Sequence, residues 1–93
     1  FIALPGGFGT LEELFEIITW AQLGLHQKPI GLLNINGFYE NLVKMLETMT
    51  VKGFLKMENL DLLIVDDSID SLLDKMANFK PLQVPKWLNI ERS

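Results

Sequence analysis

The sequence predicts an α/β protein of the Rossmann-like type, with a parallel sheet and helices on both of its faces. Short apolar runs alternate three times with stretches whose apolar residues recur at helical spacing, which gives the order β-α-β-α-β-α. Hydrophobic residues make up 48% of the chain, as is typical of parallel strands that are buried on both faces. Because strands that alternate with helices are joined by right-handed crossovers, we expect a parallel sheet built from three β-α units.

The first unit covers residues 1–24. Residues 1–4 are apolar enough for the buried end of a strand, and residues 5–9 form a glycine-rich turn. A helix then runs from Thr10, which can cap it, to about Gly24, which can end it. The apolar side of this helix consists of Leu11, Leu14, Phe15, Ile18 and Ala21.

The second and third units follow the same plan. Residues 30–33 predict a second buried strand, residues 34–37 a turn, and residues 38–51 a helix that ends before Gly53. Residues 60–65 predict a third buried strand. Asp66, Asp67 and Ser68 then offer caps for a last helix. The apolar face of that helix consists of Ile69, Leu72, Leu73 and Met76.

Three strands are few for such a sheet, and the strand at residues 1–4 is expected to lie centrally in a larger one. We therefore expect residues 1–79 to be the C-terminal half of a single nucleotide-binding domain. Residues 80–93 contain Pro81, Pro85 and Trp87 without clear periodicity, and we expect them to form a C-terminal arm on a surface.

Composition narrows the classes of partner. Eight basic and twelve acidic residues give a net charge of -4, and no basic cluster is present, so we do not expect a nucleic-acid partner. The apolar runs are too short to cross a bilayer, so we expect no membrane contact. Without cysteine, this sequence can form neither disulfides nor thiolate metal sites, and the cytoplasm is the expected location.

The glycine-rich turn carries the clearest functional signal. Its residues lack the side chains that would keep a phosphate away, and it leads directly into a helix N-terminus, where anions bind well. Its spacing fits neither the GxGxxG dinucleotide fingerprint nor a Walker P-loop. Two simpler interpretations remain open: the turn only connects a strand to a helix, and Glu12, Glu13 and Glu16 only complement the helix dipole.

Residues 5–13, Pro-Gly-Gly-Phe-Gly-Thr-Leu-Glu-Glu, resemble the PGGxGTxxE signature of the LONELY GUY family. Members of this family are phosphoribohydrolases that act on cytokinin riboside monophosphates and were formerly described as lysine decarboxylases. The resemblance continues through residues 19–24 and 28–34 and weakens from about Lys44 onward. It therefore covers the first unit and the second strand best.

The resemblance implies a role for each matching position. Glu13, the last residue of the signature, would be the catalytic carboxylate, and Glu12 and Thr19 would also contact the nucleotide. The 5′-phosphate would be held by the loop and the start of the helix, at Gly6, Gly7, Phe8, Gly9, Thr10 and Leu11. In this family the carboxylate works with an arginine upstream of the signature, and Arg92 does not match it. A homodimer and the absence of any cofactor or metal are further implications.

We therefore expect an enzyme that hydrolyses the N-glycosidic bond of a purine nucleoside 5′-monophosphate, giving free base and ribose 5-phosphate. By resemblance, the base would be an N6-prenylated adenine. A carboxylate suits this reaction because it stabilises the positive charge that develops on the ribose and can orient or deprotonate the attacking water. Two alternatives stay open: a module that binds a nucleotide or cofactor phosphate without turnover, and an inert fragment that needs an N-terminal half.

Overall fold

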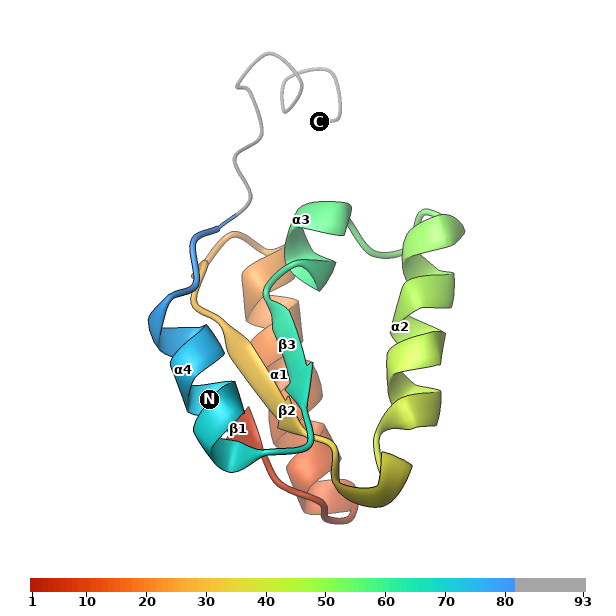
Figure 1. The fold of residues 1–93 in the computed structure, drawn as a ribbon. Helices are drawn as coiled ribbons and strands as arrows, with labels where there is room; N and C mark the ends of the chain where they lie inside the picture. Colours follow the sequence, from red (N-terminus) through yellow and green to blue (C-terminus); the bar gives the residue numbers. More distant parts are fainter. Residues whose placement is uncertain (82–93) are drawn as a thin grey trace.

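The computed structural model describes residues 1–81, and it confirms the predicted fold class (Figure 1). Three parallel strands form one sheet in the order β1-β2-β3, in which Ile2 pairs with Gly31 and Gly31 pairs with Ile64. The elements in chain order are β1 (Ile2–Ala3), α1 (Phe8–Gln22), β2 (Ile30–Leu33), the 3-10 turn η1 (Ile35–Gly37), α2 (Glu40–Val51), α3 (Met57–Leu60), β3 (Leu63–Asp66) and α4 (Ile69–Ala77).

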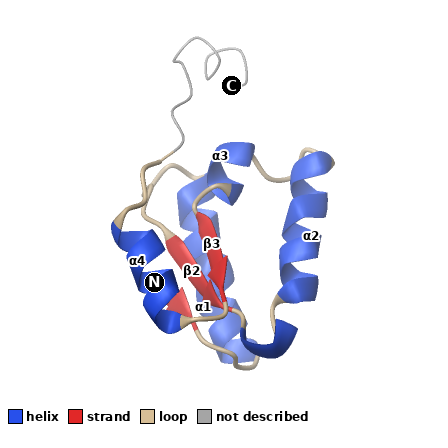
Figure 2. Cartoon of the chain, in the orientation of Figure 1, coloured by secondary structure: helices blue, strands red, loops and turns tan. Residues whose placement is uncertain are grey.

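Helices cover both faces of the sheet, because alternate residues of the central strand point in opposite directions. Ile30 and Leu32 of β2 are buried in the core together with Leu14 of α1, and residues of α2 pack against the same cluster. Gly31 lies on the opposite face, where α4 crosses so closely that a Cβ would come 2.7 Å from the Met76 Sδ. Figures 1 and 2 show α1 and α4 on opposite sides of the strands.

The start of α1 differs from the sequence-based expectation. The helix begins at Phe8 with Gly7 as its N-cap, so the prediction that Thr10 caps it is wrong. Glycine is accepted at the N-cap position, and the helix therefore starts earlier than a side-chain cap would indicate. Thr10 lies inside the first turn. At the other end α1 stops at Gln22, close to the predicted end, and Gly24 has a φ of 79°.

The third strand was also predicted inaccurately. It begins at Leu63, because Leu60 belongs to the short helix α3, which the sequence reading missed. All four residues of β3 are half-buried, whereas β2 is buried throughout. Within residues 1–81 β3 pairs on one edge, with β2, and an edge strand is less covered than a central one.

The first strand is likewise more exposed than predicted. Ala3 is buried, but Phe1 is 40% and Leu4 55% exposed. In the described part of the chain β1 lies at an edge of the sheet, and its central place in a larger sheet stays a prediction. Most of the predicted arm, residues 82–93, lies outside the described residues, and no helix in residues 1–81 is long and apolar enough to cross a membrane.

Candidate active site

The glycine-rich loop lies at the carboxyl ends of the strands. In a parallel sheet these ends share one edge, and in open α/β sheets ligands bind beyond that edge. Three connections meet there: residues 4–7 after β1, residues 34–39 after β2 and residues 67–68 after β3 (Figure 1). The structure therefore places the signature where this fold class binds its ligands.

The N-terminus of α1 offers backbone donors to an anion. The first hydrogen bond of the helix runs from the Leu11 N–H to the Gly7 carbonyl, at 3.1 Å. The N–H groups of Phe8, Gly9 and Thr10 precede this bond, so they have no acceptor within the helix. They form a donor set at the positive end of the helix dipole, which suits a phosphate.

The glycines of the loop serve two different purposes. A Cβ at Gly6 would collide with the Thr10 Oγ1, so glycine lets the Thr10 side chain lie against the loop. At Gly7 and Gly9 nothing in residues 1–81 beyond the adjoining backbone lies within 4 Å of where a Cβ would stand. Packing within the described chain therefore does not require glycine at either position. Their lack of a side chain keeps the approach to the helix end open from outside.

Glu13 lies on the same flank of α1 as Thr10. The two residues are three positions apart, about 60° around the helix and about 4.5 Å along it. Glu13 is exposed, and among residues 1–81 its carboxylate forms no ion pair. Its charge is therefore available to a ligand held at the helix end.

The other predicted site residues of α1 point elsewhere. Glu12 is exposed and lies nearly opposite Thr10 around the helix. Thr19 is about 13 Å further along the axis and half a turn around, and its hydroxyl donates to the Phe15 carbonyl at 2.7 Å. The Leu11 side chain packs against the core, while Phe8 is 90% exposed at the mouth of the loop. The structure thus gathers Gly6, Gly7, Gly9, Thr10 and Glu13 and does not bring Thr19 to them.

Sequence reasoning missed two residues at this edge, Asn34 and Tyr39. Tyr39 is buried, and its hydroxyl donates to the Leu4 carbonyl at 2.5 Å. Its own N–H donates to the Asn34 Oδ1 at 2.7 Å. An aromatic residue with a polar tip, placed directly after a turn at a strand end, was the available signal, since a buried Tyr hydroxyl needs a partner.

Asp66, at the end of β3, interacts with residues at the start of the last helix and within it. Its carboxylate accepts hydrogen bonds from the Ser71 hydroxyl at 2.5 Å and the Ser68 N–H at 3.1 Å, and lies 2.8 Å from the Lys75 Nζ. The Lys75 ammonium, followed by these two donors, holds the pKa of Asp66 well below its usual range. The predicted capping by Ser68 is confirmed, since its Oγ accepts from the Ser71 N–H.

An open cavity of about 570 Å³ adjoins Asp66 at the ends of β2 and β3. Its lining is polar and largely acidic, with Glu40, Asp66 and Asp67 against a single lysine, Lys75, which is already paired. The carboxylates of this lining would repel a negatively charged phosphate. The loop after β1 therefore remains the better candidate for phosphate binding.

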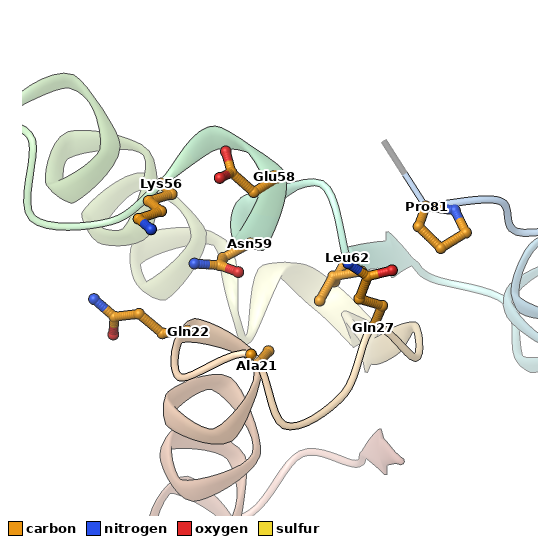
Figure 3. A pocket seen from close by; sticks show the side chains of 9 residues that line it. Ala21, Gln22, Gln27, Lys56, Glu58, Asn59, Leu62 and Pro81 are labelled. Atoms are coloured by element: carbon orange, nitrogen blue, oxygen red, sulfur yellow. The ribbon is translucent and has the colours of Figure 1, made fainter. Parts of the chain in front are cut away.

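A second hollow lies at the far end of α1, between that helix and α3 (Figure 3). It has a volume of about 150 Å³, and Gln22, Asn59 and Leu62 are among the residues that line it. The buried Nδ2 of Asn59 has no hydrogen-bond partner in the described part of the chain. The hollow can hold a few water molecules, which would satisfy this amide, but it is about 21 Å along α1 from the glycine loop.

Comparisons with known proteins cover most of the described chain. Residues 1–76 match the protein-family model described as "Possible lysine decarboxylase". The match includes the glycine loop, Glu13 and the whole sheet.

Curated relatives carry a more specific name. The chain is 46% identical over 93 residues to a "Probable cytokinin riboside 5'-monophosphate phosphoribohydrolase LOGL3" from Oryza sativa subsp. japonica, covering 98% of this chain and 44% of the relative. It is 46% identical over 81 residues to the "Cytokinin riboside 5'-monophosphate phosphoribohydrolase LOG4" of Arabidopsis thaliana, covering 87% of this chain and 38% of that protein. The chain thus spans less than half the length of these relatives.

Proposed function

The chain belongs to the LONELY GUY family, whose model is described as "Possible lysine decarboxylase", and from this premise we propose that the protein hydrolyses the N-glycosidic bond of an adenosine-type 5′-monophosphate. The products would be the free base and ribose 5-phosphate. One observation carries the proposal: the free amides at the start of α1 and the Glu13 carboxylate lie on one exposed flank, a single helical turn apart.

The phosphate of the substrate is held at the helix end in this proposal. The N–H groups of Phe8, Gly9 and Thr10 donate to its oxygens, and the Thr10 hydroxyl, which lies against Gly6, donates to another. Because ribose is bonded directly to the phosphate, the sugar then lies within reach of the next turn of the helix. This is where Glu13 projects.

Glu13 acts on the reacting carbon of the ribose. As the bond between C1′ and the base nitrogen breaks, the base leaves with the electron pair, and positive charge develops on the sugar. The carboxylate stabilises that charge and orients a water molecule, whose oxygen bonds to C1′. The water proton passes to Glu13, the departing base takes a proton from the solvent, and Glu13 then returns its own proton to the solvent. Exposure of Glu13 in the free chain gives water access to this point.

Two further features of the proposal come from the family resemblance. An N6-prenylated adenine as the base agrees with the names of the relatives, which specify cytokinin ribosides. An arginine is expected to work with Glu13, but Arg92, the sole arginine of the sequence, lies outside the described residues. Residues 1–81 thus offer no candidate for that role, and a homodimer stays a prediction.

The variants Glu13→Gln and Glu16→Gln test the proposal as a matched pair. Each removes one charge from an exposed position of α1, so their effects on folding should be alike. With AMP and an N6-prenyl-adenosine monophosphate as substrates, Glu13→Gln should lower base release at least about 100-fold and leave nucleotide affinity nearly unchanged. Glu16→Gln should retain activity.

Two results would contradict the proposed enzymatic activity. If the protein binds the nucleotide but releases no base, the glycine loop belongs to a binding module. If both variants release base at the rate of the parent protein, Glu13 is not the catalytic carboxylate.

A further inference from the structure

Tyr39 connects the exit of β1 to the start of α2. Its hydroxyl donates to the Leu4 carbonyl, which follows the last paired residue of β1 and precedes the glycines by two positions. The two residues are 35 positions apart in the chain. Tyr39 is 2% exposed, and its ring packs edge-to-face against Phe38 with the ring centres 4.9 Å apart. Because the Tyr39 ring is buried and packed, its hydroxyl is held in a defined position against the Leu4 carbonyl.

A second hydrogen bond holds the backbone of Tyr39 in place. The Asn34 Oδ1 accepts from the Tyr39 N–H at 2.7 Å, and Asn34 directly follows β2. Between Asn34 and Tyr39 the chain makes a tight turn, in which Asn36 and Gly37 have positive φ values of 53° and 72°. This turn brings the two residues close enough for the hydrogen bond. The chain from the end of β2 therefore carries Tyr39 to a set position at the carboxyl edge.

The Leu4 carbonyl is a sensitive point of the glycine loop. The residue before a proline is restricted to extended conformations, so the direction of the Leu4 carbonyl and the path of Pro5 are coupled. Gly6 and Gly7 come next, and glycine has more conformational freedom than any other residue. Fixing the last carbonyl before them is an effective way to define where their N–H groups and the helix start point.

We infer that Tyr39 is a positioning residue, which sets the geometry of the glycine loop through its hydrogen bond to Leu4 and is itself held by Asn34. This inference rests on the proposed function, in which the loop holds a phosphate. Burial raises the pKa of the Tyr39 hydroxyl, so the group stays protonated and can donate. Tyr39 touches neither phosphate nor sugar in this scheme, and it acts through the backbone.

Tyr39→Phe isolates the hydroxyl, because the ring and its packing remain. Thr50→Val is the matched control: it removes a half-buried hydroxyl that likewise donates to a backbone carbonyl, that of Leu46 at 3.0 Å, at the far end of α2. Each variant is compared with the parent chain in two ways. The amide shifts of Gly6 and Gly7 are recorded by NMR without ligand, and the affinity for AMP is measured by titration.

The inference predicts that Tyr39→Phe shifts the Gly6 and Gly7 amides and weakens AMP binding by about 3- to 10-fold, the worth of one hydrogen bond. Thr50→Val should leave both unchanged. If Tyr39→Phe lowers thermal stability but alters neither readout, the residue is merely structural and the inference is overturned. If the parent chain binds no AMP, the proposed function fails, and the Gly6 and Gly7 shifts alone decide the role of Tyr39.

Asn34 supplies a second test should Tyr39→Phe fail to fold. Asn34→Asp keeps an acceptor for the Tyr39 N–H, whereas Asn34→Ala removes it. The inference predicts that Asn34→Ala shifts the Gly6 and Gly7 amides and that Asn34→Asp restores them toward the parent values. Equal shifts in the two variants would overturn it.

Discussion

Lys75 of α4 lies 2.8 Å from the Asp66 carboxylate at the end of β3, and this pair joins the last helix to the carboxyl edge of the sheet. The Asp66 side chain is only 9% exposed, whereas the Lys75 side chain is 55% exposed. Ser68 and Ser71 complete the hydrogen bonds of the carboxylate. The cluster is therefore a structural connection between a strand and the helix that follows it.

Stability should depend on pH through Asp66. Its pKa is lowered in the folded chain, so it contributes stability above the ordinary aspartate pKa of about 4, and this contribution is lost as the pH falls below that value. Urea unfolding between pH 7 and pH 3 should show that the parent chain loses more stability than Asp66→Asn does. Asp67→Asn, a neighbouring exposed carboxylate, serves as the control and should follow the parent. Parallel pH profiles for all three proteins would contradict this assignment.

Gly31 should tolerate no larger residue. A Cβ there would meet the Met76 Sδ at 2.7 Å and the Leu72 methyl carbons at 3.2 and 3.3 Å. We expect Gly31→Val to lower the free energy of unfolding by about 1–3 kcal/mol, the usual cost of overpacking a core. Adding Met76→Ala should recover part of the loss, because it removes the nearest obstacle. Equal urea midpoints for Gly31→Val and the parent chain would show that α4 does not pack on β2 as described.

Gly9 should behave in the opposite way. It lies in the first turn of α1 with open space where a Cβ would project, and alanine is a better helix former than glycine by about 0.5–1 kcal/mol. Gly9→Ala should therefore keep or raise stability while weakening AMP binding, because the methyl group obstructs the approach to the helix end. Thermal unfolding and a binding titration on the same sample separate the two effects. Unchanged affinity would mean that the phosphate does not approach at Gly9.

The sequence was sufficient to predict the alternation of strands and helices, because strong local patterns determine it. Ile30 to Leu33 is an uninterrupted apolar run between turn signals, and the helix after the glycine loop keeps one apolar side from Leu11 to Ala21. Helix α3 escaped prediction because four residues are too few to show a period. The exposure of β1 and β3 depends on their edge positions, which local patterns do not reveal.

Part of the candidate site could also be predicted, because it lies in one continuous stretch of sequence. The signature at residues 5–13 is contiguous, so the sequence alone brings the glycines, Thr10 and Glu13 together. Tyr39 meets Leu4 only because β1 and β2 are neighbours in a set register and the turn after β2 folds back over that edge. Thr19 falls on the opposite side of α1, a consequence of its nine-residue spacing from Thr10. Contacts that depend on register or on helical phase need the folded chain.

The proposed phosphate site is tested most directly by mapping where a nucleotide binds, from backbone amide shifts during titration with AMP. We expect the largest shifts at Phe8, Gly9 and Thr10, with smaller ones at Glu13, and we expect inorganic phosphate to shift the first three as well. The hollow beside Asn59 at the far end of α1 should stay unaffected. Shifts confined to that hollow or to the cavity beside Asp66, with none at the start of α1, would rule out the proposed site.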